Sequence, residues 1–117
     1  MYRLEFIDLG EYRGDEYYLC GFVVPEPVDG ENYDPDADAS AWGVSVARKR
    51  IDHSNQEIVR LDTAHGQDPH IDKEYLPENS IPDKKEVLTD EWPYSRMKQY
   101  LLSTWKQYAD LYSYYND

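Results

Sequence analysis

Two histidines, one arginine and three aspartates occur together between residues 60 and 72. Residues 58–62 have the apolar, β-branched character of a strand, and they lead into a loop with glycine and proline that carries His65 and His70. A strand that ends in such a loop can present acid, base and anion-binding groups from a rigid support. We therefore expect the catalytic or binding chemistry of this chain to lie in this segment.

The residue types in this segment suit acid–base chemistry on an RNA phosphodiester. Imidazole titrates near neutral pH, so His65 or His70 could take the proton from a 2′-hydroxyl while an acid protonates the leaving oxygen. Arg60, helped by Lys49, would stabilise the charge on the phosphate, and Asp62 would orient an imidazole or hold Arg60. The substrate supplies the nucleophile, so this reaction requires no cofactor and no metal.

Two other interpretations of the same residues stay open. Asp62, His65, His70 and Asp72 form a mixed nitrogen and oxygen set that could bind zinc or manganese, although their spacing matches no strong metal motif. Alternatively, the histidines only form hydrogen bonds to carboxylates and backbone groups at a tight turn.

A concentration of cations precedes this segment in an otherwise acidic chain. Residues 42–53 and 56–63 are expected to form a hairpin that turns at residues 54 and 55, which would set Lys49 directly opposite Arg60. Like charges in that position are destabilising unless an anion lies between them. Arg48, Lys49 and Arg60 therefore either form a phosphate-binding patch or pair with nearby carboxylates while their stems cover the sheet.

The composition narrows the class of protein. Acidic residues number 24 against 12 Lys and Arg, which gives a net charge of −12, and 15% of the residues are aromatic. That aromatic content favours a folded domain over a disordered acidic tail. A dispersed acidic surface is typical of proteins that work in molar salt, where charge repulsion is screened. We expect a halophilic protein, the alternative being an acidic protein that binds a basic partner.

The cellular setting predicted from the sequence is the cytoplasm. The single cysteine, Cys20, excludes an intramolecular disulfide and lies in an apolar run typical of a buried thiol. The first residues do not resemble a signal peptide, and no apolar run is long enough to cross a membrane. We expect no membrane partner.

The periodicity predicts a single α+β domain over residues 1–117: an antiparallel sheet of about four to five strands packed against one long C-terminal helix. The sheet region is 1–76, with strands expected at 2–9, 17–24, 42–53, 56–63 and 71–75. The acidic, proline-rich segment 25–40 is expected to be a solvated loop, and 77–89 a connection. Between about 90 and 115, aromatic and apolar residues recur every three or four positions, which predicts the helix, with Thr89 or Asp90 as its N-cap.

The segment Arg60-x-Asp62-x-Ala64-His65-Gly66, followed by His70, resembles the core of the small TumE-like toxin family. The resemblance covers these few residues and the general architecture of a sheet followed by a helix. It implies the toxin half of a toxin–antitoxin pair, acting on RNA and neutralised by a small antitoxin protein. The family has a denser group of histidines after the glycine, where this chain has aspartates.

Three hypotheses follow from the sequence. The first is a toxin-like, RNA-targeting protein that could act as a metal-independent ribonuclease, with His65, His70 and Asp62 as catalytic residues and Arg60, Lys49 and Arg48 binding the substrate. The second is a non-enzymatic interaction module that binds a partner protein or forms a homodimer through its acidic surface and tyrosine-rich helix. The third is a metal-dependent hydrolase.

Overall fold

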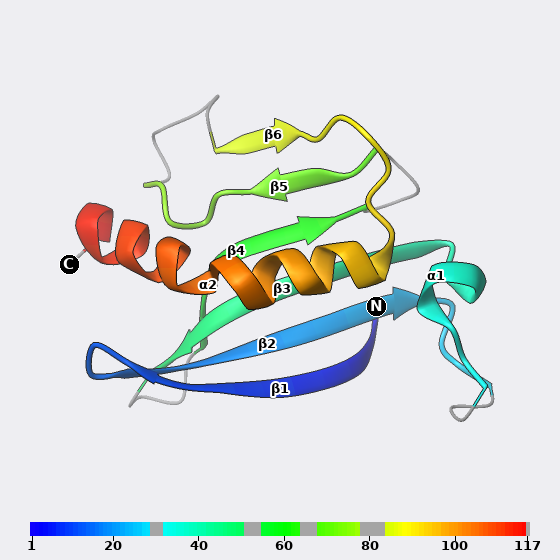
Figure 1. The fold of residues 1–117 in the computed structure, drawn as a ribbon, viewed down its shortest axis with the longest axis horizontal. Coiled ribbons are helices and arrows are strands. Elements are labelled where there is room, and N and C mark those ends of the chain that lie inside the picture. The colour runs from blue at the N-terminus through cyan, green and yellow to red at the C-terminus, as the bar shows by residue number, and fades with distance from the viewer. Residues whose placement is uncertain (29–31, 51–54, 64–67, 78–83, 117) are drawn as a thin grey trace.

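The computed structural model describes residues 1–28, 32–50, 55–63, 68–77 and 84–116. It confirms the α+β class: a six-stranded antiparallel sheet in sequence order lies against one long helix, α2 (Tyr94–Asn116) (Figure 1). The strands are β1 (Tyr2–Tyr12), β2 (Asp15–Val24), β3 (Ala41–Lys49), β4 (Asn55–Asp62), β5 (His70–Asp72) and β6 (Lys85–Val87). The sheet has more strands than expected because β6, within the predicted connection 77–89, pairs with β5.

The first hairpin is longer than the sequence pattern predicts. Its turn is formed by Arg13 and Gly14, whose φ angles of +53° and +90° suit the tight turns that match the twist of antiparallel strands. The first strand was expected to end at Gly10, but β1 continues to Tyr12. Gly10 adopts a φ of +88° next to a shift in register, so the strand bends there without ending.

The pairing of β3 with β4 differs from the predicted register. Ser45 lies opposite Arg60, and Lys49 lies opposite Asn55, so the expected pairing of Lys49 with Arg60 is wrong. The connection between the strands is longer than two residues, and most of it (51–54) lies outside the described residues. A bulge adds a further shift, because Val46 pairs with Val59 while Ala47 pairs with Glu57.

The core lies between the sheet and α2. Alternate side chains of the central strands point toward the helix and are buried. The side chains of Tyr94, Met97 and Leu101, in the first turns of α2, are buried against them. Trp105 packs against Tyr17 of β2 and Tyr12 of β1, with ring centroids 5.2 and 5.7 Å away. The predicted helical stripe is buried from Tyr94 to Tyr112, and only its last member, Tyr115, is exposed.

The helix begins later than predicted, at Tyr94 rather than near Asp90. Asp90 has a φ of +68°, which is not a helix-capping conformation, and it lies four residues before the helix. The backbone N–H of Ser95 instead donates to the carboxylate of Asp36, 2.9 Å away. Asp36 belongs to a short helix, α1 (Pro35–Asp38), inside the segment that was expected to be only loop. An acidic loop thus supplies the acceptor that the positive end of α2 favours.

Within the described residues, no helix is both long enough and apolar enough to span a lipid bilayer.

Candidate functional site

Strands β4 and β5 bring the charged residues of the predicted site together. Their pairing sets Arg60 opposite Asp72 and Asp62 opposite His70. Glu57, from the start of β4, joins them through its contact with Arg60. We call Glu57, Arg60, Asp62, His70 and Asp72 the β4–β5 charge cluster.

Arg60 lies at the centre of this cluster and contacts all three carboxylates. Its Nη1 lies 2.9 Å from Glu57 Oε1, and its Nη2 lies 2.9 Å from Asp72 Oδ2. Its Nε lies 2.8 Å from Asp62 Oδ2, as an ion pair and not an aligned hydrogen bond. Burial alone would lower the pKa of the guanidinium, but the carboxylates, Glu57 foremost, raise it above its ordinary value. The donors of Arg60 therefore already face protein carboxylates.

His70 is the most enclosed member, with its side chain 3% exposed. Its Nε2 lies 2.6 Å from Asp62 Oδ1 and 3.5 Å from Asp72 Oδ2. Its Nδ1 lies 3.4 Å from the backbone carbonyl oxygen of Asp68. Asp62 thus contacts both His70 and Arg60, the two partners that the sequence suggested for it.

Glu57 was not recognised in the sequence as part of the site, because strict alternation along β4 would place it on the opposite face from Arg60. The bulge opposite Val46 and Ala47 shifts the alternation by one residue, so Ile58 and Val59 are both buried and Glu57 reaches Arg60. Burial raises the pKa of the Glu57 carboxyl, and Arg60 offsets only part of that effect. Only the register of β4 against β3 shows that Glu57 lies on the same face as Arg60.

The cluster lies on the face of the sheet away from α2. Val59 and Leu61 of β4 pack in the helix-covered core, so Arg60 and Asp62 between and after them point the other way. Among the described elements, α2 is the helix that packs across the sheet, and it covers one face only (Figure 1). The charged cluster is therefore built on the face without this helix, which we call the uncovered face, and the side chains of Asp62 and His70 are nevertheless buried there.

The structure separates the other predicted cations from Arg60. The guanidinium of Arg48 lies on the helix side, 4.9 Å from the ring centroid of Tyr112 and 2.9 Å from the side-chain oxygen of Gln56. Its side chain is only 4% exposed and also contacts Asp15 at 3.4 Å. Lys49 is mostly exposed and lies 3.7 Å from Glu16. The described residues therefore do not assemble the phosphate-binding patch expected from Arg48, Lys49 and Arg60.

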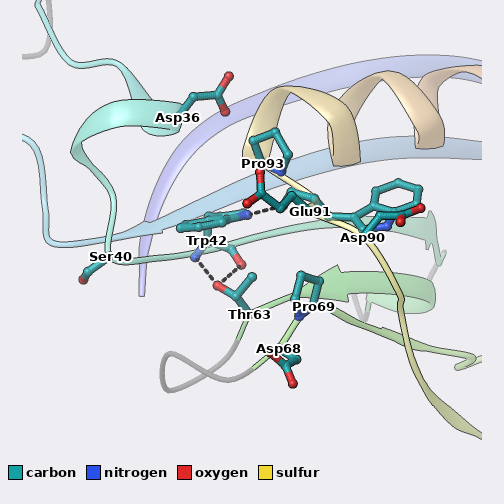
Figure 2. A pocket seen from close by; sticks show the side chains of 10 residues that line it. Asp36, Ser40, Trp42, Thr63, Asp68, Pro69, Asp90, Glu91 and Pro93 are labelled. Atoms are coloured by element: carbon teal, nitrogen blue, oxygen red, sulfur yellow. Dashed lines mark hydrogen bonds between the residues drawn. The ribbon is translucent and has the colours of Figure 1, made fainter.

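His65 lies outside the described residues, but the residues on either side of its segment, Thr63 and Asp68, line a pocket of about 440 Å³ (Figure 2). Thr63 directly follows β4 and lies beside the start of β3, where its hydroxyl accepts from the backbone N–H of Trp42 at 3.1 Å. The Trp42 indole in turn donates to the backbone carbonyl of Trp92 at 2.8 Å, which ties the pocket to the start of α2.

The pocket is acidic. Its described lining includes four carboxylates and two tryptophans but no lysine or arginine: Asp36, Asp68, Asp90, Glu91, Trp42 and Trp92. Such a lining repels a phosphate group, because each carboxylate adds like charge at close range. A phosphate-bearing ligand is better accommodated elsewhere on the molecule.

Aromatic side chains occupy the other half of the uncovered face. Phe6 and Tyr18 stack with ring centroids 4.8 Å apart, Phe6 is 53% exposed, and the Arg3 guanidinium lies 5.8 Å from the Phe6 ring. Burial raises the pKa of the Tyr18 hydroxyl, and the Glu57 carboxylate raises it further. In the sheet register, Tyr18 pairs with Ala47, which pairs with Glu57, so the aromatic pair and the charge cluster lie on opposite sides of β3.

The same geometry bears on the metal interpretation. Asp62, His70 and Asp72 each offer one ligand atom, and these atoms lie within 4.8 Å of one another. The fourth predicted ligand, His65, lies outside the described residues.

No protein-family model, no curated protein and no solved structure matches this chain. The resemblance to the TumE-like toxin family stays a prediction.

Proposed function

We propose that this chain is an RNA-targeting protein of the toxin type that binds single-stranded RNA on the uncovered face of its sheet. The observation that supports this proposal best is the stack of the exposed Phe6 ring on the half-buried Tyr18 ring, on the same face as the charge cluster. Exposed aromatic rings on an open sheet are a common platform for unpaired bases. A ring such as Phe6 accepts any base, since every base has a π-face.

The net charge of −12 shapes how such binding would work. Proteins that bind RNA through many phosphate contacts lose affinity steeply as salt rises. In the halophilic cytoplasm that we propose as the setting, stacking and hydrogen bonds would supply most of the affinity, and Arg3 beside Phe6 would supply a local cation.

The roles within the site follow from the burial of each group. His70 is enclosed and lies 2.6 Å from Asp62, so its proposed role is to position the start of β5 against β4. His65 keeps the predicted acid–base role, and ribonuclease activity is the form of the function in which it would take part. The guanidinium of Arg60 already contacts three carboxylates. It would therefore stabilise a phosphate only while it also keeps contacts with those carboxylates. A cognate antitoxin protein is the partner that this function predicts.

The first test is inducible expression of the wild-type protein and of His65→Ala in a halophilic host, with total RNA sampled over time. Growth arrest and loss of RNA with the wild type alone would support an RNA-directed toxin that works through His65. Arrest with both proteins would support RNA binding without cleavage by His65. Unimpaired growth and intact RNA with both would refute the toxin proposal.

The second candidate function is a protein-interaction module. Exposed apolar side chains favour it, because they also suit a protein interface. Phe6 and Tyr2 are 53% and 42% exposed on β1, which is an edge strand of the sheet. Pairing of two such edges would form a homodimer. Light scattering in molar KCl distinguishes the candidates: a dimer that Phe6→Ala converts to monomer favours the module, and a monomer that binds RNA favours the first proposal.

A further inference from the structure

The imidazole of His70 faces oxygen acceptors on both of its nitrogens. Nδ1 lies near the Asp68 carbonyl oxygen, and Nε2 lies near carboxylate oxygens of Asp62 and Asp72. A neutral imidazole has one N–H and one lone pair, so it cannot donate on both sides. If Nδ1 donates to the carbonyl, the lone pair on Nε2 points at two carboxylates. With that tautomer, the arrangement requires a cation between the three groups, either a second proton on the ring or a metal ion. With the other tautomer, Nε2 donates to Asp62 and the lone pair lies on Nδ1.

The charges of the cluster favour the same conclusion. With His70 neutral, the five residues contain three carboxylates and one guanidinium, in a region where Asp62 and His70 are almost fully buried. Carboxylates in such surroundings need cations close by. One divalent cation would bring the formal charge of the cluster to zero.

We propose that Asp62, His70 and Asp72 bind one divalent transition-metal ion of the zinc or manganese class. Ligand atoms bonded at about 2.1 Å in tetrahedral geometry lie roughly 3.4 Å apart, and the distance from His70 Nε2 to Asp72 Oδ2 is 3.5 Å. The shorter contact with Asp62, 2.6 Å, opens to that value by a small rotation of the carboxylate. A set of one imidazole and two carboxylates suits zinc and manganese better than calcium or copper.

The neighbours of the three ligands resemble the outer shell of a metal site. The Asp68 carbonyl oxygen lies 3.4 Å from Nδ1 and would accept from it in the tautomer that leaves Nε2 for a metal, as is usual for ligating histidines. Arg60 contacts the Oδ2 atoms of Asp62 and Asp72, and Asp72 Oδ2 is also the oxygen that faces Nε2 of His70. Counted over the described residues, three protein ligands leave one position of a tetrahedral site open, the arrangement found in catalytic sites.

This inference does not depend on the proposed RNA function, and it has a test of its own. ¹⁵N-labelled wild-type protein, stripped with a chelator and kept in molar KCl, is titrated with Zn²⁺ while the imidazole nitrogens are followed by long-range ¹H–¹⁵N spectra. We expect Nε2 of His70 to shift and the change to be complete at one equivalent of Zn²⁺. A His70 ring that does not respond to Zn²⁺ would overturn the proposal, in favour of a protonated ion-pair cluster if both nitrogens carry protons and of a plain hydrogen bond to Asp62 if only Nε2 does.

Two conservative variants locate the binding. Asp72→Asn should weaken Zn²⁺ binding at least tenfold, because it replaces a charged ligand with a neutral one, while Asp38→Asn, in the exposed α1, should leave it unchanged. Equal affinity in both variants would mean that Zn²⁺ binds the acidic surface adventitiously, which refutes the site. If Asp72→Asn does not fold, the wild-type titration still decides.

Discussion

His70 and Asp62 face each other directly across β5 and β4, with Nε2 and Oδ1 2.6 Å apart and both side chains buried. The same Asp62 carboxylate contacts Arg60 through its other oxygen. One acidic side chain thus connects the imidazole to the guanidinium, and the geometry of the cluster depends on it.

Replacement of Asp62 should therefore destabilise the fold more than an ordinary acidic substitution. Asp62→Ala leaves Arg60 and His70 without their shared partner, so we expect a loss of about 3 kcal/mol in the free energy of unfolding. Asp62→Asn, which keeps one acceptor oxygen, should lose less. Denaturant unfolding at fixed KCl concentration measures the change, with the exposed Glu26→Gln as a control that stays within about 0.5 kcal/mol. Equal effects of Asp62→Ala and Glu26→Gln would contradict the role of Asp62.

Glu57 should give the protein a recognisable dependence of stability on pH. Its pKa in the folded protein is raised above the ordinary value of 4.5, chiefly by burial. The folded state therefore binds this proton more tightly than the unfolded state, and the resulting stabilisation is complete below pH 4.5 and is lost as the pH rises through the raised pKa. The unfolding free energy of the wild type relative to Glu57→Gln should fall over that window. A difference that rises with pH would show that the ion pair with Arg60 outweighs burial.

Substitution of Arg48 should lower the stability of the fold and leave the affinity for RNA unchanged. Its guanidinium stacks on Tyr112 and is enclosed on the helix side of the sheet, so Arg48→Lys loses the planar contact and should cost about 1–3 kcal/mol. The neighbouring Lys49→Gln is the matched control, because Lys49 is exposed and its substitution should change little. Chemical unfolding and RNA titration of both variants test this. Reduced RNA affinity in a folded Arg48→Lys protein would reinstate the phosphate-binding role predicted from the sequence.

Phe6 should carry much of the affinity for single-stranded RNA. Stacking of a base on an aromatic ring is worth about 1–3 kcal/mol, so Phe6→Ala should weaken binding at least fivefold. Tyr114→Ala removes another exposed ring, 81% accessible, from α2 and should not change the affinity. Fluorescence anisotropy with a labelled oligonucleotide in molar KCl provides the comparison. If the two variants bind equally, the uncovered face is not the RNA-binding surface.

The sequence predicts the elements that have strong periodicity. The helical stripe from Tyr94 to Tyr112 recurs every three or four residues, and its burial against the sheet is confirmed. The strand ranges are likewise approximately right, because apolar alternation is a local property. By contrast, all three residues of β6 (Lys85–Val87) are exposed and show no apolar alternation. The sequence pattern therefore did not indicate that this segment pairs with β5.

The candidate site was only partly predictable for a related reason. Arg60, Asp62 and His70 stood out by residue type and short spacing, and the antiparallel pairing of β4 with β5 does bring them together. Lys49 was assigned to the same site through a register that assumed a two-residue turn. The longer connection and the bulge displace it, and neither can be read from local propensity.

Because of the bulge at Ile58, the number of residues in β4 determines which side chains face the core. The strand consists of two halves in opposite alternation, joined where Ile58 and Val59 both enter the core. Deletion of Ile58 would restore one alternation and turn Glu57 toward the apolar layer beneath α2, or else turn Arg60 and Asp62 there. Relatives of this protein should therefore keep an apolar residue at this position and have neither an insertion nor a deletion there.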